Sequence, residues 1–261
     1  MSKSILITGA GTGLGRGTAL GLAQAGHHVI ATVEITSQVT SLREEAKEKG
    51  IELEVMKVNI NDPGDLRAME HCDFDIFVAN AALGEGGPIA EIPVQRLKDL
   101  FETNVFSTLK TAQIAARKFV QKQSGKIVFV SSIAGLSAAP YLGPYSATKH
   151  ALEAIAQSMK EELKPFGVQV ATINPGPYKT GFNDRMVEEP WKWYDPKIHF
   201  TTREQYAKGT EVFEKQFAPE EMIAKMVEVI PAEHHAFRTV WPERSEKQVK
   251  DYEQKIWEDT I

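Results

Sequence analysis

The feature that most constrains the fold of this chain is a glycine-rich turn directly after its first apolar segment. Residues 4–7 read Ser-Ile-Leu-Ile, as in a short buried strand, and every second residue from Gly9 to Gly17 is then a glycine. A periodic stretch, Leu14–Ala25, follows and ends at Gly26. Glycines between a strand and a helix let the backbone approach a phosphate, and the first N–H groups of the helix attract an anion. A merely flexible turn is the plainer interpretation, but the strand-turn-helix order favours a pyrophosphate site.

Short apolar runs alternate with longer amphipathic stretches along most of the chain. Strands are predicted at residues 4–7, 29–33, 53–58, 76–79, 126–130, 168–173 and 237–241. Helices are predicted at residues 14–25, 37–49, 65–71, 94–123, 145–163 and 219–229. This alternation is typical of parallel strands joined by crossover helices. We therefore expect an α/β protein, a doubly wound, Rossmann-like parallel sheet of about seven strands with helices on both faces, in one domain over residues 1–261.

Composition narrows the class of protein. With 261 residues, of which 42% are hydrophobic, the chain can bury one substantial core. A net charge of −5 with both signs dispersed argues against a nucleic-acid surface. The single cysteine, Cys72, fits a reducing compartment, and the first apolar run is too short for a signal or membrane segment. We expect a cytoplasmic protein that binds neither nucleic acid nor membrane, and no histidine has neighbours spaced for a metal site.

A second motif pairs a tyrosine with a lysine. Tyr145 and Lys149 stand four residues apart, so on a helix both side chains lie on one face. A phenol has a pKa of about 10, and lowering it to about 7 requires about 4 kcal/mol. An adjacent buried ammonium can supply energy of that order. The pair is therefore a candidate acid/base site near neutral pH.

Polar residues also follow two of the later predicted strands. Ser131 and Ser132 come directly after residues 126–130, and the run Asn174 to Thr180 comes after the next strand. The carboxyl ends of parallel strands are where open α/β sheets bind their ligands. The sequence therefore predicts one site that combines these residues with the glycine turn.

These motifs, taken in order, resemble the short-chain dehydrogenase/reductase family over nearly the whole chain, from Ser4 to about Trp241. Two departures from the family pattern stand out. The usual Asn-Asn-Ala-Gly is Ala-Asn-Ala-Ala at residues 79–82, and the usual glycine-rich end of the last strand is replaced by Trp-Pro-Glu-Arg at residues 241–244. The matching motifs are Thr8-Gly9-x-x-x-Gly13-x-Gly15, Asn80-Ala81, Asn104, Ser132, Tyr145-x-x-x-Lys149 and Pro175-Gly176 with Thr180.

The resemblance implies an NAD(P)-dependent oxidoreductase that moves a hydride between nicotinamide and a hydrophobic secondary alcohol or ketone. Tyr145 would exchange the proton with the substrate oxygen, and Lys149 would hold its phenol partly ionised and bind the ribose. Ser132, which stands 13 residues before Tyr145, would bind the substrate oxygen. Asn104 would position a water that links Lys149 to solvent.

The resemblance also assigns the cofactor site. Thr180 would bind the carboxamide, and Asn80 would brace the fourth strand near the ribose. The residues assigned to the cofactor are Gly9, Gly11, Thr12, Gly13, Leu14, Gly15, Glu34, Asn59, Ile60, Asn80, Ala81, Tyr145, Lys149, Pro175, Gly176 and Thr180.

The residues after the second predicted strand favour NAD over NADP. NAD-binding members of the family usually carry an acidic residue at the place of Val33, and Glu34 lies one step later. NADP-binding members often carry a basic residue at the place of Glu34 or of Thr12. A carboxylate accepts hydrogen bonds from both ribose hydroxyls and repels a 2′-phosphate. The alternative is that Glu34 points into solvent and both cofactors are accepted.

Two segments lie outside the alternating pattern. Residues 183–217 carry many aromatic residues and no strand signal, and in the family this position forms a flap over the substrate. Those aromatic side chains could equally anchor the insertion to the core. Residues 242–261 predict a charged helix, at about 243–259, that packs on the body or on a partner subunit.

Partners and alternatives follow from the same residues. Small and apolar side chains on helices 94–123 and 145–163 predict a homodimer or homotetramer, in particular Leu109, Ala112, Ala115, Ala116, Ala147, Ala151, Ala154 and Ile155. Two other functions remain open on this fold: a non-redox enzyme of the dehalogenase or lyase kind, and a binding protein that senses a dinucleotide. The substrate pocket is predicted to be mostly apolar, formed by Leu83, Ile133, Leu136, Tyr141, Leu142, Tyr178 and Phe182.

Overall fold

The computed structural model describes residues 2–260. Its strands form one seven-stranded sheet in the order β3-β2-β1-β4-β5-β6-β7, and every neighbouring pair is parallel. The predicted doubly wound parallel sheet is therefore confirmed. The strands are β1 (Ser4–Ile7), β2 (His28–Val33), β3 (Glu54–Lys57), β4 (Ile76–Ala79), β5 (Gly125–Val130), β6 (Val168–Pro175) and β7 (Arg238–Trp241).

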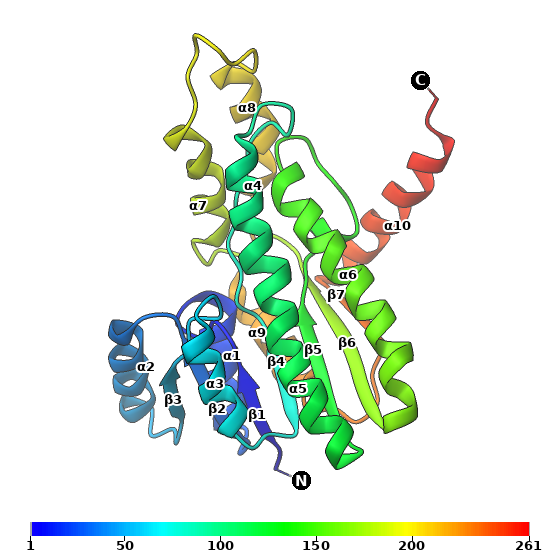
Figure 1. Ribbon diagram of the computed structural model, residues 1–261. Helices are drawn as coiled ribbons and strands as arrows, with labels where there is room; N and C mark the ends of the chain where they lie inside the picture. Colours follow the sequence, from blue (N-terminus) through cyan, green and yellow to red (C-terminus); the bar gives the residue numbers. More distant parts are fainter. Residues whose placement is uncertain (1, 261) are drawn as a thin grey trace.

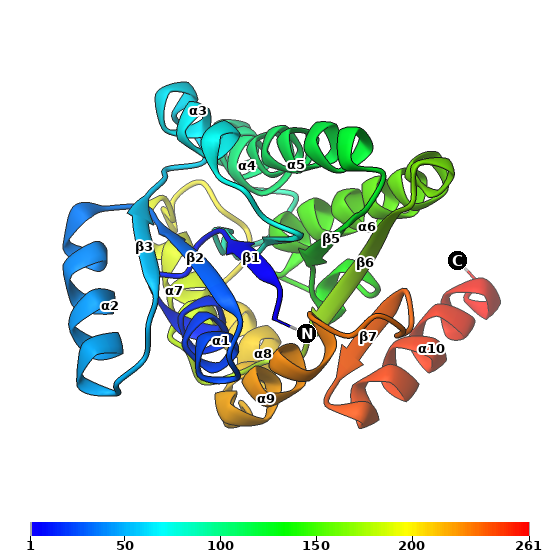
Figure 2. The same cartoon turned by 90° about the horizontal axis from the view of Figure 1, so that it is seen from below.

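Helices cover both faces of this sheet (Figures 1 and 2). One face is covered by α1 (Gly13–Gln24), α2 (Thr36–Glu48) and α9 (Pro219–Val229). The other face is covered by α3 (Pro63–His71), α4 (Val94–Phe101), α5 (Thr108–Lys122) and α6 (Gly143–Leu163).

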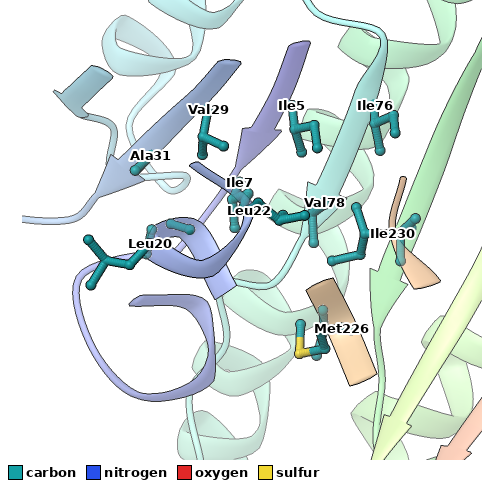
Figure 3. Packing of buried hydrophobic residues seen from close by; sticks show 14 of the residues in the cluster. Ile5, Ile7, Leu20, Leu22, Val29, Ala31, Ile76, Val78, Met226 and Ile230 are labelled. Atoms are coloured by element: carbon teal, nitrogen blue, oxygen red, sulfur yellow. The ribbon is translucent and has the colours of Figure 1, made fainter. Parts of the chain in front are cut away.

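Alternating side chains of the strands supply a core on each face. In β1, Ile5 and Ile7 point towards α1 and α9, whereas Leu6 points towards the helices on the opposite face. Figure 3 shows the first of these cores, where Leu20 and Leu22 of α1 lie against strand residues. Apolar residues on both sides of each strand explain why the sequence gives continuous apolar runs instead of strict alternation.

The long helix predicted at residues 94–123 is interrupted. A π-helical turn, Glu102–Ser107, separates α4 from α5. A π turn holds one more residue than an α turn and so rotates the helix face that follows it. Apolar periodicity predicts that a helix exists, but it does not reveal a single extra residue inside it. Asn104 lies within this turn.

The remaining segments lie at the periphery. Helices α7 (Phe182–Glu188) and α8 (Arg203–Thr210) stand over the carboxyl ends of the strands, in the segment predicted as a flap (Figure 1). Helix α10 (Glu243–Glu258) extends outward beside β7. Among residues 2–260, no helix combines the length and the apolar composition that a membrane crossing requires.

Candidate active site

A cavity of about 380 Å³ opens at the carboxyl ends of the strands, around the point where β1 lies between β2 and β4. The connections leave β1 and β4 in opposite directions there, and the gap between them is the usual ligand site of a doubly wound sheet. Every residue that the sequence assigned to the cofactor lines this cavity, as do Ser132, Tyr145 and Lys149. Residues from distant parts of the chain thus converge as expected.

The glycine turn is held in place by the loop after β4. Thr8 Oγ1 accepts hydrogen bonds from the backbone N–H groups of Asn80 (3.1 Å) and Ala81 (3.2 Å). The Asn80 amide donates to the carbonyl oxygens of Thr8 (3.0 Å) and Gly9 (3.1 Å). Gly9 has a φ of +67°, and a Cβ there would lie 2.7 Å from Ala81 Cα. Only glycine fits this position, and Asn80 braces the turn as well as the strand.

The start of α1 fits a phosphate group. Its N-cap residue, Thr12, makes no side-chain hydrogen bond to the helix, and the first turn contains no acidic residue. The N–H groups at this end are therefore not occupied by a side-chain cap, and the helix dipole adds partial positive charge. Thr180, which also lines the cavity, lies directly against the start of this helix: a Cβ on Gly13 would lie 3.3 Å from Thr180 Cβ. The residues present therefore fit the pyrophosphate of a dinucleotide.

Glu34 and Gln38 also line the cavity, at the carboxyl end of β2. Gln38 Oε1 accepts hydrogen bonds from the backbone N–H groups of Glu34 (3.1 Å) and Ile35 (3.4 Å). The Gln38 amide also covers Gly11, where a Cβ would lie 2.5 Å from Gln38 Cδ. Sequence reasoning missed Gln38, although glutamine at the third position of a helix that follows a strand is a recognisable capping signal.

Helix α6 carries the two residues of the Tyr-x-x-x-Lys motif into the cavity. Tyr145 is 8% exposed and Lys149 is 2% exposed. Lys149 Nζ lies 5.6 Å from the centre of the Tyr145 ring and donates to the Val130 carbonyl oxygen at the end of β5 (2.9 Å). Ser132 caps the short turn after β5, where its Oγ accepts from Ala134 N (3.1 Å). Helix α6 thus holds Tyr145 and Lys149, and the turn after β5 holds Ser132.

Burial dominates the electrostatics of this group. It raises the pKa of the Tyr145 phenol, and a hydrogen bond with Ser132 lowers it by a smaller amount. Burial also lowers the pKa of Lys149 from 10.5 to about 8, against the attraction of Glu153. For the Tyr145 phenol, lost hydration outweighs the hydrogen bond with Ser132. The role of Lys149 in ionising the phenol stays a prediction. The protonated phenol is the favoured form.

Asn104 does not line the cavity. It is fully buried beneath it, in the π-helical turn. Its Oδ1 accepts from the backbone N–H of Leu83 (2.8 Å), and its Nδ2 donates to Leu83 O (2.8 Å) and to Thr148 Oγ1 (3.2 Å). The side chain therefore fixes the loop after β4 to α6, and both of its polar atoms have protein partners.

The substrate side of the cavity differs in part from the prediction. Leu83, Tyr178 and Phe182 line it, whereas Ile133, Leu136, Tyr141 and Leu142 do not. Leu136 packs with Val240 and Val249 under α10, and Leu142 packs behind Tyr145 with Met186. The flap adds residues that sequence reasoning missed, because nothing in the sequence tells which way α7 faces. The added residues are Asn183, Arg185 and Glu189.

Within residues 2–260, no three His, Cys, Asp or Glu side chains are grouped so that they could hold a metal ion.

Comparison with known proteins agrees with this geometry. The model of the family described as short chain dehydrogenase matches residues 3–191. A Staphylococcus epidermidis protein named diacetyl reductase [(S)-acetoin forming] is 37% identical over 202 residues, 75% of this chain and 79% of its own. The uncharacterized oxidoreductase YusZ of Bacillus subtilis is 35% identical over 189 residues, 69% of this chain and 67% of its own.

Solved structures share the fold. A short chain dehydrogenase/reductase from Burkholderia phymatum, in complex with NAD, has a TM-score of 0.83 at 20% identity and covers 100% of this chain and 98% of its own. A short-chain dehydrogenase from Sphingobium yanoikuyae, in complex with NADPH, has a TM-score of 0.74 at 21% identity, with 99% and 96% covered. The family model and the curated relatives together assign this chain to the short-chain dehydrogenase family of oxidoreductases.

Proposed function

We propose that the protein is an NAD-dependent oxidoreductase that interconverts a hydrophobic ketone and its secondary alcohol. One observation carries the proposal: Ser132, Tyr145 and Lys149 meet at a cavity whose other end is formed by the glycine turn. A bound nicotinamide dinucleotide would supply or accept the hydride at this place. The protein groups would handle the substrate oxygen and its proton.

Tyr145 is the proton carrier in this proposal. Since burial raises its pKa, the phenol is protonated at neutral pH and suited to donate a proton to a developing alkoxide. Ser132 Oγ would donate a hydrogen bond to the same oxygen and stabilise its charge. Lys149, charged below a pH of about 8, would add positive potential beside the phenol. These properties favour the reductive direction.

Asn104 has a modified role in this scheme. Its side-chain amide is bonded to Leu83 and Thr148 and does not reach the cavity, so it would not hold a water there. We therefore assign the side chain to the shape of the cavity wall.

Apolar side chains form the wall of the cavity beside the Tyr145 phenol, where the substrate would bind. The Phe182 ring lies 5.5 Å from the Tyr145 ring, and Leu83 is 49% exposed at the cavity wall. Apolar contacts discriminate only by about 1–3 kcal/mol per methylene, so we expect a range of related ketones to react. The name of the Staphylococcus epidermidis relative makes small diketones such as diacetyl part of the panel to test.

NAD is the proposed cofactor. Glu34 lines the cavity after β2, where the adenosine ribose would lie, and its carboxylate would repel the 2′-phosphate of NADP. We expect kcat/KM to favour NADH over NADPH at least about tenfold, which corresponds to about 1.4 kcal/mol. Steady-state kinetics with both cofactors and one ketone measure the ratio. Equal efficiencies, or a preference for NADPH, would remove Glu34 from the proposal.

Loss of absorbance of the reduced nicotinamide, followed with a panel of ketones, tests the function. Tyr145→Phe keeps the ring volume and removes the proton carrier, so turnover should fall by about 10²-fold or more. Cofactor binding, measured by fluorescence titration, should survive. Bound cofactor without turnover by the wild type would instead favour a dinucleotide sensor, and turnover without a change in cofactor absorbance would favour a non-redox enzyme.

A further inference from the structure

A buried carboxylate stands one helical turn beyond Lys149. Tyr145, Lys149 and Glu153 follow one another at four-residue spacing on α6 and share one face of the helix. The Glu153 side chain is only 5% exposed. It does not line the cavity, so the proposed reaction does not use it directly. A carboxylate buried this deeply requires compensating partners.

Two strands supply those partners. Arg238 in β7 donates to Glu153 Oε2 from NH2 (2.8 Å) and from Nε (3.2 Å). Asn174 in β6 donates from Nδ2 to Glu153 Oε1 (2.6 Å). Arg238 balances the charge, and both carboxylate oxygens are hydrogen-bonded, which is the arrangement that makes a buried ion pair tolerable.

Asn174 continues this network to the catalytic serine. The residue is fully buried, and its Nδ2 also donates to the main-chain carbonyl oxygen of Ser132 (3.0 Å). Its Oδ1 accepts from Thr172 Oγ1 (3.0 Å), which fixes the orientation of the amide. The network therefore runs from Arg238 through Glu153 and Asn174 to Ser132.

The segment at Ser132 needs such a support. Strand β5 ends at Val130, and the last backbone link to β6 is the bond from Ser131 N to Ile173 O (2.8 Å). Beyond it, Ser132 O accepts from Gly135 N within its own turn (3.0 Å) and from Asn174 of the neighbouring strand. Asn174 thus ties this turn to β6 through a bond shorter than that from Ser132 Oγ to Pro175 O (3.5 Å).

We propose that Glu153 and Asn174 are positioning residues that hold Ser132 in register with Tyr145. The inference rests on the proposed function. The turn after Ser132 packs on α6 so closely that a Cβ on Gly135 would lie 3.0 Å from Lys149 O. A small displacement of the turn therefore separates the serine hydroxyl from the phenol. Misplacement of a reacting group by about 1 Å can cost about 10²-fold in rate.

Asn174→Ala provides the first test, at a pH well below the pKa of Lys149. It should lower kcat for ketone reduction about tenfold or more, and leave the KM for NADH within about threefold, because the glycine turn is untouched. Glu162→Gln, on an exposed part of the same helix, is the matched control and should keep wild-type kinetics. An Asn174→Ala enzyme with wild-type kcat overturns the proposal.

The Glu153 variants test the same network independently. Glu153→Ala should lower kcat, and Glu153→Gln, which keeps an oxygen that can accept from Asn174, should recover much of the loss. Equal kcat values for the two variants would contradict the positioning role. These variants also decide the matter if Asn174→Ala fails to fold.

A double-mutant cycle separates positioning of Ser132 from general destabilisation. If Asn174 acts through Ser132, adding Asn174→Ala to Ser132→Ala should change kcat by no more than about twofold. If the same tenfold loss appears in both backgrounds, Asn174 acts elsewhere and the proposal falls. A wild type without redox turnover would instead refute the proposed function, so the two failures are distinguishable.

Discussion

Burial shifts the pKa values of Tyr145 and Lys149, one helical turn apart, in opposite directions. The Tyr145 phenol holds its proton more tightly, because burial disfavours the phenolate. The Lys149 ammonium holds its proton less tightly, because burial disfavours the cation. Around neutral pH both groups still carry their protons, which suits a donor phenol beside a positive charge.

The pH dependence of ketone reduction should report Lys149. Its pKa is lowered to about 8, so the positive charge is complete at lower pH and is lost as the pH rises through that value. Tyr145 keeps its proton over this window, since its pKa is raised above that of an ordinary phenol. We expect kcat/KM for reduction to be level near neutral pH and to fall above about 8.

A profile that stays level to about pH 10 would contradict this prediction: either Lys149 keeps its charge over that range or the charge has no influence on the rate. Glu153→Gln is an informative variant, because Glu153 attracts the Lys149 proton. The kcat/KM of this variant for reduction should begin to fall at a lower pH than that of the wild type.

At the scale of elements, the flap is fastened to the body by a small charged cluster. Glu85 in the loop after β4 accepts from Arg96 of α4 at 2.8 and 3.1 Å and from Trp193 Nε1 at 3.2 Å. Arg96 also pairs with Glu189 of the flap (2.7 Å), and Glu189 lines the cavity. These contacts link the α7–α8 segment to the wall of the substrate site.

Arg96→Ala should loosen the flap. Removing the guanidinium leaves Glu85 buried without its cation, and Glu189 loses one of its two ion pairs. We expect the ketone KM to rise several-fold, with a smaller effect on the NADH KM, and limited proteolysis to cut residues 183–217 faster. Lys98→Ala on the exposed side of α4 is the control. An unchanged KM together with unchanged cleavage would exclude a fastening role.

What the sequence could predict depends on how local each signal is. The strands and the glycine turn are local patterns, so both were found, with boundaries shifted by a residue or two. The π turn around Asn104 is a one-residue irregularity and left no periodic trace. Glu153 and Arg238 are 85 positions apart, and the bond of Asn174 to Ser132 spans 42. Such contacts exist only after β5, β6 and β7 have paired, so no spacing in the chain reveals them.

At the scale of the whole molecule, the outer surfaces of α4, α5 and α6 are candidates for self-association. The sequence offered Ala112 and Ala115 for this role, but both are fully buried in the core of the subunit. Apolar residues that stay exposed on these elements include Val94, Ala147, Ala154 and Phe106, which is 50% exposed. Exposed apolar and small side chains on these helices are compatible with a close two-fold contact.

We predict at least a homodimer through this surface. Light scattering at micromolar concentration should give a mass of twice 29.0 kDa or more. Phe106→Glu, which puts a charge into the contact, should shift the mass towards that of one chain. Gln24→Glu, an exposed change on α1 at the opposite face of the sheet, is the control. A wild-type particle with the mass of one chain would refute the prediction.

The direction of the strands has a practical consequence. All seven are parallel, so the cavity opens at one edge of the sheet, while β1 begins at Ser4 on the opposite edge, where Figure 1 marks the N-terminus. A bead, electrode or resin attached through the first residues would therefore lie at the end of the strands opposite the cavity. Reactants would still reach the cleft from the open solution, which makes the N-terminal end the preferred point for immobilising this protein as a reusable catalyst.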